Sequence, residues 1–438
     1  MAKDVPALAL TGEQTTDVRD FVMSELCQPT PPVKLLYVTP EFVTRSGRAR
    51  DIFGLLHRRK QLARFVIDEA HCVSQWGHDF RPDYKELGIL RRECPGIPIM
   101  AMTATANHRV RTDVLSNLSI EGCVVLEQSF NRSNLHYEVR QKGKDCLSEI
   151  ASFIRARHRG ECGIVYCLSR QACEDVAAKL TDKFDVQAKH YHAGMTKKDR
   201  MLVQRKWQQG EFKVIVATIA FGMGIDKADV RYVVHHTLPS SLEGYYQETG
   251  RAGRDGLAST CVLFYAYKDS TSIQRLIERG EGTEAQKDQR RTNLHQVISY
   301  CMNKTDCRRA QVLQYFGEIF EPADCHHSCD NCKENKDEMK TMDVTEQALS
   351  LVRLVKDIAQ AKVGLGVTML HCVDTFRGIA KKSIRDRGHD ECAEFGKGAS
   401  LSRGDVERLF HRLLVERILG ERSEVNAKGF ANAYVTVS

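Results

Sequence analysis

Two adjacent carboxylates, Asp68 and Glu69, follow directly after the short apolar run Phe65-Val66-Ile67. In a site that hydrolyses a nucleotide, one such carboxylate can hold Mg²⁺ through water while its neighbour orients the attacking water. Acidic pairs are also common in solvated turns, so the pair needs support from its surroundings. We therefore treat Asp68-Glu69-Ala70-His71 as a candidate phosphate-hydrolysing motif.

An aromatic and polar segment, CVSQWGHDFRPDY, follows these acids, and the sequence MTATA comes later at 102–106. Trp76 and Phe80 offer faces on which bases can stack, and Arg81 offers a phosphate contact. The alternative is that both aromatic residues anchor the loop in the protein core. The residue types fit a contact with a single strand of nucleic acid.

Two arginines, Arg251 and Arg254, lie three residues apart in the segment YYQETGRAGRDG. Arginine suits the spread-out charge of a phosphoryl group in a transition state, so both side chains could face a γ-phosphate. The apolar run 214–221 precedes Gly224 and Asp226, where small residues let the backbone approach a phosphate or sugar closely. The alternative is a surface arginine pair on a structural helix.

Four cysteines late in the chain have the spacing C-x17-C-x3-C-x2-C. They are Cys307, Cys325, Cys329 and Cys332. Four thiolates at this spacing favour a structural, tetrahedral Zn²⁺ site. The remaining cysteines, of 16 in all, are scattered singly, which indicates reduced thiols rather than a disulfide framework. We interpret His326 and His327, in the same turn, as exposed loop residues.

The elements that must position these residues are α/β layers. Short apolar runs at 33–40, 63–70, 162–167 and 214–221 alternate with polar, helix-periodic segments, as buried parallel strands do. Open α/β sheets bind ligands at the carboxyl ends of their strands. The segment 130–145 is polar and strand-poor, so we expect the connection between two such layers there.

A third unit is expected from about residue 340. Ser402 with Asp405 resembles a helix N-terminal cap ahead of an apolar face, and Asp343 with Glu346 does the same for an earlier helix. The tail has a glycine-containing turn between two strand-like arms, near 426–434. Helices followed by a hairpin predict a winged helix.

A basic cluster in this third unit is the best candidate for phosphate contacts. It comprises Lys381, Lys382, Arg385 and Arg387. The alternative is a merely solvated face. The chain carries a net charge of +7, which permits a polyanionic partner without proving one.

Length and composition limit the number of domains and the class of protein. With 438 residues the chain is too long for one core, and two to four domains are expected. Its 42% hydrophobic and 28% charged residues exclude wholesale disorder. No stretch approaches the ~20 apolar residues of a membrane helix, and no signal pattern opens the chain, so we expect an intracellular protein without membrane contact.

Taken together, these motifs resemble the RecQ family of DNA helicases over almost the whole chain. ARFVIDEAHCVSQWGHDF and ATIAFGMGIDKADVR are similar to its Bloom-type branch, and CRR…YFGE…CDNC resembles its zinc module. The resemblance implies an α/β fold with two RecA-like lobes, the first incomplete, then a helical zinc-binding module and a winged helix. The expected boundaries are 1–134, 135–267, 268–339 and 340–438.

The resemblance also implies roles for individual residues. Catalysis is expected from Asp68, Glu69, His71, Gln247, Arg251 and Arg254, with Arg254 as the arginine finger. Contact with ATP and Mg²⁺ is expected from Asp68, Gly224, Asp226, Arg251 and Arg254. Contact with DNA is expected from Trp76, Phe80, Arg81, Thr218, Lys381 and Lys382. Zn²⁺ is expected on all four cysteines of the late cluster.

The implied activity is ATP-dependent 3′-to-5′ unwinding of DNA in recombination, repair and replication, in the nucleus. The expected partners are single-stranded and forked or branched DNA, together with recombination or repair proteins.

A motor of this class also needs a glycine-rich loop that ends in Gly-Lys-Ser/Thr and cradles the phosphates. Gly143-Lys144 is followed by Asp145, and Gly396-Lys397 by Gly398, so the sequence contains no such loop. We therefore expect a truncated first lobe, exposed apolar surface and low stability over residues 1–130, and impaired hydrolysis. The alternatives are a non-motor DNA-binding module and a fragment of a full helicase.

Overall fold

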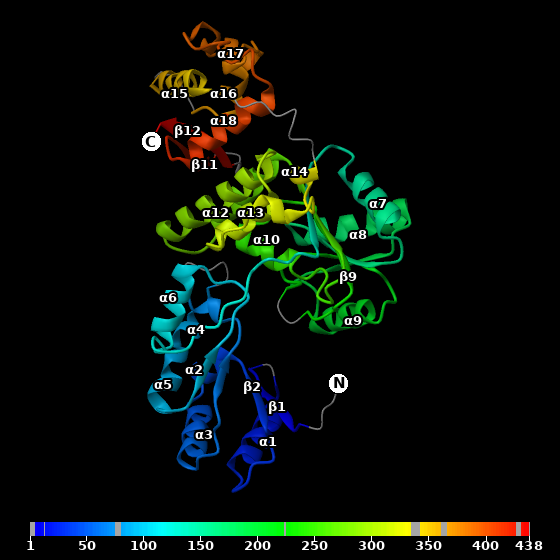
Figure 1. Ribbon diagram of the computed structural model, residues 1–438, viewed down its shortest axis with the longest axis vertical. Coiled ribbons are helices and arrows are strands. Elements are labelled where there is room, and N and C mark those ends of the chain that lie inside the picture. The colour runs from blue at the N-terminus through cyan, green and yellow to red at the C-terminus, as the bar shows by residue number, and fades with distance from the viewer. Residues whose placement is uncertain are drawn as a thin grey trace. The chain divides into compact units, whose positions relative to one another are not determined.

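The computed structural model describes residues 5–12, 14–74, 80–222, 225–333, 342–360, 366–425 and 431–437. Contacts divide the chain into two compact units, Met1–Ser129 and Phe130–Ser438. Figure 1 traces both units along the chain. Each is described by itself.

The first unit contains two short parallel ladders, in which β1 pairs with β2 and β3 with β4. Its strands are β1 (Ala7–Leu10), β2 (Leu35–Val38), β3 (Phe65–Ile67) and β4 (Ile99–Ala101). Its longer helices are α1 (Thr16–Cys27), α2 (Pro40–Arg45), α3 (Gly47–Arg58) and α6 (His108–Asn117). Shorter turns of helix are η1 (Ala70–Val73), α4 (Pro82–Lys85), η2 (Glu86–Gly88) and α5 (Ile89–Glu93).

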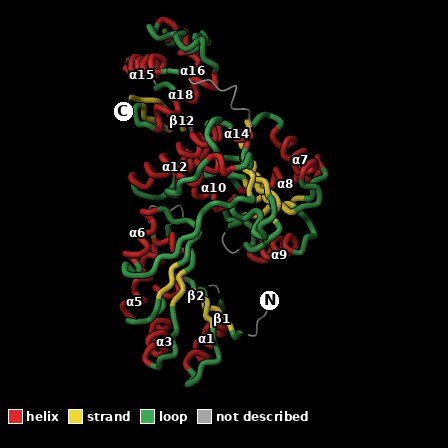
Figure 2. Tube along the Cα trace, viewed as in Figure 1, coloured by secondary structure: helices red, strands yellow, loops and turns green. Residues whose placement is uncertain are grey.

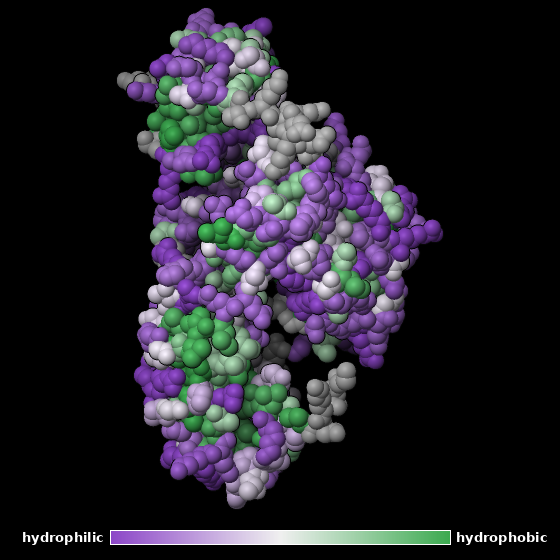
Figure 3. Space-filling view, in the orientation of Figure 1, coloured by the Kyte–Doolittle hydropathy of each residue, from purple (hydrophilic) through white to green (hydrophobic). Residues whose placement is uncertain are grey.

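Each of these ladders leaves apolar side chains exposed on one side. Leu35 and Tyr37 of β2 are 44% and 62% exposed, and Val66 of β3 and Met100 of β4 are also exposed. Because successive strand residues point to opposite faces, the intervening positions face the packed cores instead. Figure 3 shows hydrophobic residues gathered on the surface of this unit. Such an exposed apolar surface is what the sequence predicts for this part of the chain.

The second unit is built on a six-stranded, all-parallel sheet with the order β5-β10-β9-β6-β8-β7. Its strands are β5 (Leu135–Gln141), β6 (Cys162–Tyr166), β7 (Ala188–Tyr191), β8 (Val214–Ala217), β9 (Val230–His235) and β10 (Ser259–Tyr265). The helices among them are α7 (Cys146–Arg157), α8 (Arg170–Phe184), α9 (Lys197–Gln208) and α10 (Leu242–Thr249). Figure 2 shows helices on both sides of this sheet.

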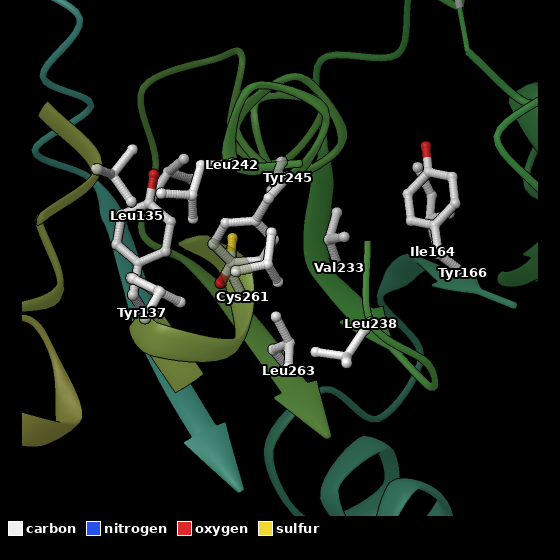
Figure 4. Packing of buried hydrophobic residues seen from close by; sticks show 14 of the residues in the cluster. Leu135, Tyr137, Ile164, Tyr166, Val233, Leu238, Leu242, Tyr245, Cys261 and Leu263 are labelled. Atoms are coloured by element: carbon white, nitrogen blue, oxygen red, sulfur yellow. The ribbon is translucent and has the colours of Figure 1, made fainter. Parts of the chain in front are cut away.

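Both faces of the sheet are buried. Val165 of β6 packs with α7 and α8 on one face, whereas Ile164 and Tyr166 face a second core that includes Tyr245 of α10. Figure 4 shows part of this second core, with Tyr245 beside Cys261 of β10. Burial on both faces explains the nearly continuous apolar runs of β6 and β8.

The segment 130–145 differs from the sequence-based expectation. It was expected to be strand-poor, but β5 forms inside it and pairs in parallel with β10. Its polar side chains are tolerated because β5 lies at the edge of the sheet, where His136, Glu138 and Arg140 are half-buried and Gln141 is exposed. The other edge of β5 is covered by the late cysteine turn, since Tyr137 bridges Cys329 and Val139 N donates to Asp330 Oδ2 at 2.8 Å.

Helices follow the sheet in the second unit. They are α11 (Tyr267–Arg279), α12 (Glu284–Met302), α13 (Arg308–Tyr315), η3 (Pro322–Cys325) and α14 (Asp330–Lys333). Residues Leu294, Val297 and Ile298 of α12 belong to the same core as one face of the sheet. None of the helices in the described ranges has the length and apolar composition needed to span a membrane.

The last part has helices followed by a hairpin, as a winged helix does. It comprises α15 (Thr345–Gln360), α16 (Met369–Phe376), α17 (Lys382–Arg385), η5 (His389–Glu391), α18 (Arg403–Val415), β11 (Leu419–Val425) and β12 (Ala431–Val437). Strands β11 and β12 pair antiparallel. Ser402 caps α18 by accepting from Asp405 N at 3.1 Å. Within the turn expected near 426–434, residues 426–430 lie outside the described residues.

A buried carboxylate joins this winged-helix part to the helices before it. Glu421 of β11 accepts from Gln274 Nε2 at 2.9 Å and lies 3.6 Å from His295 Nε2. Tyr267 donates to the other carboxylate oxygen, and its ring contacts His411. Burial alone would raise the pKa of Glu421, but His295, His411 and Gln274 outweigh it and hold that pKa below its usual range. Glu421 is therefore the polar centre of this contact.

The exposed apolar sides of the first unit predict how the chain is digested. Limited proteolysis should cut within residues 5–129 before it cuts within the sheet of the second unit, because local opening costs less where fewer apolar groups are buried. Mass spectrometry of early fragments measures the order. Equal survival of both units would contradict this expectation.

The Glu421 contact predicts a dependence of stability on pH. Glu421→Gln should lower the free energy of unfolding by about 1–3 kcal/mol, as expected for a disrupted buried hydrogen-bond network. Burial lowers the pKa of His411 to about 4, so as pH falls below 6.5 the unfolded state takes up the proton first and stability declines toward pH 4. The depressed pKa of Glu421 adds a loss below its ordinary value of 4.5.

Denaturant unfolding between pH 7.5 and pH 4 measures both effects. The His411→Asn variant should remove part of the loss between pH 6.5 and 4, since burial also lowers the pKa of His236 and that of His371 to about 4. An unchanged profile in that variant would exclude His411 as a titrating group. A wild-type stability that rises on acidification would contradict both assignments.

Candidate functional site

The acidic pair lies at the carboxyl end of β3, as the sequence predicts. Asp68 is exposed and Glu69 is half-buried, and Glu69 adopts left-handed backbone angles with a φ of 51°. Asp68 Oδ1 accepts from the Glu69 backbone N–H at 2.9 Å. A non-glycine residue in this conformation is uncommon and often marks a functional turn. The turn presents two carboxylates at a strand end, where a hydrated Mg²⁺ could be held.

His71 links this turn to the loop after β4. It is buried, with Nδ1 at 3.0 Å from Thr103 Oγ1 and 3.4 Å from Glu69 Oε2. Thr103 Oγ1 in turn donates to the Thr105 carbonyl at 3.1 Å, and the Ala70 amide donates to the Met102 carbonyl. The turn Asp68-Glu69-Ala70-His71, called the DEAH turn below, and the MTATA sequence at 102–106 are therefore one hydrogen-bonded assembly within the first unit.

The aromatic-rich loop is described only at its two ends. Trp76 lies outside the described residues, and Phe80 and Arg81 are both half-buried. The Arg81 amide donates to the Cys72 carbonyl at 3.0 Å, which returns the chain to the DEAH turn. Half-burial of Phe80 fits both a stacking face and a core anchor.

The helix after this loop is tied to α2. Asp83 of α4 accepts from Thr44 Oγ1 at 2.8 Å and from Arg45 Nη2 at 2.7 Å. The hydrogen bond from Thr44, followed by those from Arg45, lowers the pKa of Asp83. The end of the aromatic-rich loop is thus held by an ionised carboxylate.

In the second unit, Arg251 and Arg254 both reach back to the loop after β8. Arg251 is buried and its Nη1 donates to the Gly222 carbonyl at 2.6 Å. Arg254 is half-exposed, and its Nη1 donates to the Ile225 carbonyl at 3.0 Å and to Asp226 Oδ1 at 3.2 Å. The structure therefore brings Arg251 to Gly222 and Arg254 to Asp226, although it does not leave their guanidinium groups free.

The remaining predicted residues of this loop region are only partly described. Gly224 lies outside the described residues. Thr218 is half-buried, and its Oγ1 accepts from the Ala220 amide at 3.4 Å. Gln247 is half-buried on α10, the helix that leads into the two arginines.

Sequence reasoning missed the residues that hold the arginine-bearing loop. Arg132 donates to the carbonyls of Gly250, Ala252 and Gly253, and Asn134 donates to those of Gly253 and Leu257. The sequence predicts only a connection in their segment. The feature of the sequence that could have identified these two residues is a polar stretch immediately before a strand.

Sequence reasoning also missed a buried pair, His235 and Glu248, near the arginine-bearing loop. His235 Nε2 and Glu248 Oε2 are 2.7 Å apart, and both residues are buried. His235 stacks on Tyr166, whose hydroxyl donates to the Phe221 carbonyl at 2.9 Å. These contacts join α10 to the ends of β6 and β9.

The four late cysteines form one buried cluster. Their sulfur atoms all lie within 4.8 Å of one another, and each cysteine is buried. A hydrogen bond from Cys307 lowers the pKa of Cys329 to about 4, and the same contact raises the pKa of Cys307. Four thiolates can be buried together only with a cation among them, so the cluster fits Zn²⁺. His326 and His327 are exposed and do not belong to the cluster.

The basic residues of the winged-helix part are not equivalent. Lys381 pairs with the buried Asp374, which also pairs with Arg403 at 3.1 Å. Lys382 is exposed, and within the described ranges no acidic group pairs with it. Lys382 is therefore better placed than Lys381 to contact a phosphate.

Four family models match successive parts of the chain. The model described as DEAD/DEAH box helicase matches residues 4–114, and the helicase conserved C-terminal domain matches 142–256. The RecQ zinc-binding model matches residues 267–333, and the RQC domain matches 338–438.

Similar proteins were found among curated sequences. The ATP-dependent DNA helicase hus2/rqh1 of Schizosaccharomyces pombe is 51% identical over 99% of this chain and 32% of its own length. The RecQ-like DNA helicase BLM of Xenopus laevis is 45% identical, again over 99% of this chain and 32% of its own length. The helicase SGS1 of Saccharomyces cerevisiae is 44% identical over 92% of this chain and 28% of its own length.

The chain therefore spans about a third of the length of these relatives. Among solved structures, the DEAD-box helicase Mss116 bound to ssRNA and UDP-BeF is 18% identical over 68% of this chain and 64% of that chain, with a TM-score of 0.47. The order of the four matched domains and the 51% identity over 99% of the chain lead to one conclusion: the chain belongs to the RecQ family of helicases.

Proposed function

We propose that this chain is the motor and DNA-binding part of an ATP-dependent 3′-to-5′ DNA helicase. The observation that carries the proposal is the succession, in one chain, of matched helicase, RecQ zinc-binding and RQC domains. Of the relatives named above, hus2/rqh1 and BLM are named DNA helicases, and SGS1 is named an ATP-dependent helicase. We place the division between the two lobes at 134/135, with the zinc module at 268–339 and the winged helix at 340–438.

In this proposal the chemistry of the first lobe lies at the DEAH turn. Bound ATP·Mg²⁺ would supply the phosphoryl group and the metal charge for hydrolysis. Asp68 would hold the metal through water and Glu69 would orient the attacking water. His71 would keep Glu69 oriented, a role that its contacts with Glu69 and Thr103 support.

The second lobe would supply positive charge to the phosphates. Arg251 and Arg254 would face them, with Arg254 as the arginine finger, and Gln247, Gly224 and Asp226 would complete the nucleotide contacts. The half-exposed guanidinium of Arg254 supports this choice, because it can exchange its contact with Asp226 for a phosphate at little cost. Arg251 is buried and would also hold the loop through the Gly222 carbonyl.

DNA would be contacted by both lobes and by the winged helix. Phe80, Arg81 and Trp76 would contact a single strand, Thr218 would contact its backbone, and the cluster with Lys382 would contact duplex phosphates. Lys381 would contribute less, because Asp374 already pairs with it. The β11–β12 hairpin is the candidate wedge at a fork.

We base the proposed biological setting on the same family. We propose single-stranded and forked or branched DNA as substrates, recombination or repair proteins as partners, and the nucleus as the location.

Hydrolysis of ATP by the 438-residue chain tests the motor proposal. We expect weak hydrolysis that DNA stimulates, since the sequence holds no Gly-Lys-Ser/Thr loop. Glu69→Gln should lower kcat by roughly 10²–10⁴-fold, the usual effect of removing a positioned general base. A coupled assay with saturating single-stranded DNA gives kcat, and fluorescence anisotropy gives DNA affinity.

Glu86→Gln is the matched control, because Glu86 is an exposed glutamate of the same unit without a role in the proposal. It should leave kcat unchanged. If the wild-type chain binds DNA but hydrolyses no ATP, the non-motor DNA-binding module or a fragment of a full helicase becomes the better description. Equal losses in the two variants would contradict the role of Glu69.

The cysteine cluster predicts a zinc content. We expect about one zinc ion per chain, held by four thiolates. Cys329→Ser should lose most of this zinc and lower the Tm, because the cluster belongs to the core of the second unit. Mass spectrometry of the metal content measures the first effect, and calorimetry measures the second.

His326→Asn is the control for this site. His326 has a positive φ of 47°, which asparagine tolerates, and it is exposed beside the cluster. The variant should keep its zinc, and zinc loss in it would show that a histidine takes part in the ligation.

A further inference from the structure

The loop 250–257, which carries Arg251 and Arg254, is held mainly through its backbone carbonyl groups. Gly253 has a φ of 57°, and a Cβ there would lie 2.4 Å from Asn134 Nδ2 and 2.8 Å from the Leu257 carbonyl oxygen. Only glycine therefore fits this turn. The close approach leaves the Gly253 carbonyl directed at the polar side chains before β5.

Arg132 is the principal donor to these carbonyls. Its Nη1 lies 3.3 Å from the Gly250 carbonyl oxygen, and its Nη2 lies 3.1 Å from that of Ala252 and 2.9 Å from that of Gly253. The three acceptor residues flank Arg251 in the sequence, and the last of them, Gly253, directly precedes Arg254. One planar guanidinium thus spans the backbone between the two arginines, which a lysine ammonium cannot do in the same geometry.

Arg132 is itself fixed by a residue next to the cysteine cluster. Arg309 of α13 is buried, and its Nη1 donates to the Arg132 carbonyl at 2.6 Å. Its Nη2 donates to the Leu135 carbonyl and to Ser328 Oγ, both at 2.8 Å. Arg309 follows Cys307 by two positions, so the backbone of Arg132 is tied to the zinc module.

Phe130 adds an apolar contact to the same assembly. Its ring stacks on Phe316 of the zinc module at 4.6 Å, and Tyr246 of α10 donates to its carbonyl at 2.8 Å. The residues that open the second unit are therefore packed between the zinc module and the helix that leads into the arginine loop.

We propose that Arg132 is a positioning residue that sets the loop of Arg251 and Arg254 through three backbone carbonyls. It does not touch the nucleotide. It holds the loop at the separation from Gly222 and Asp226 at which the two arginines are found. The inference rests on the proposed function for its catalytic consequence, but the positioning itself is a property of the loop.

Hydrogen exchange in the loop tests the positioning directly. The Gly253 amide donates to the Val230 carbonyl at 2.8 Å and the Asp255 amide to the Ala228 carbonyl at 3.3 Å, so both report on the loop. Arg132→Ala should speed their exchange by about tenfold or more, as the loss of charge-assisted hydrogen bonds predicts. Arg132→Lys should fall between wild type and Arg132→Ala.

Arg140→Ala is the matched control. Arg140 belongs to the same strand region and pairs with Glu138 at 2.7 Å, and within the described residues none of its hydrogen bonds or ion pairs reaches the loop. It should leave exchange at Gly253 and Asp255 unchanged. Zinc content and Tm, measured on every variant, report whether the second unit remains folded.

Measurements of ATP hydrolysis provide the second test of the role of Arg132. Arg132→Ala should lower kcat for DNA-stimulated hydrolysis while DNA affinity stays the same, and Arg132→Lys should recover part of kcat. Unchanged loop exchange in Arg132→Ala, or equal acceleration across the whole unit in Arg132→Ala and Arg140→Ala, overturns the proposal. If the wild-type chain hydrolyses no ATP, the motor proposal fails for this chain, while the exchange comparison still decides the role of Arg132.

Discussion

The burial of both faces of the six-stranded sheet determines where the functional loops of the second unit can lie. A parallel sheet covered by helices leaves polar groups only at the ends and edges of its strands. The loops after β8 and α10 therefore meet at one end of the sheet, and their carbonyl groups must find donors there. Arginine side chains supply these donors, which explains why Arg132, Arg251 and Arg254 all bond to backbone oxygen atoms.

The parts of this arrangement that depend on local pattern could be predicted from the sequence. Apolar runs identified β3, β6 and β8, and the acids after β3 lie at its carboxyl end as expected. The cysteine spacing predicted a cluster that the structure brings together. Each of these features follows from neighbouring residues along the chain.

The parts that depend on distant contacts could not be predicted. The strand β5 has a polar sequence and forms because β10 and the cysteine turn satisfy both of its edges. Lys381 and Lys382 are equivalent in the sequence, and only the folded chain shows that Lys381 pairs with the buried Asp374. No periodicity in the sequence shows which carbonyl groups Arg132 reaches across more than a hundred residues.

The coverage of β5 also gives the zinc module a structural role in the second unit. An uncovered edge strand presents unpaired backbone groups that favour association with other chains. Here Ser328, Cys329 and Asp330 meet that edge, and all four cysteines share a core with Leu135, Tyr137 and one face of the sheet. Because Arg309 and Phe316 extend the same contact toward the arginine loop, the turn that gathers the sulfur atoms also stabilises the edge of the sheet and the backbone that Arg132 presents to the loop.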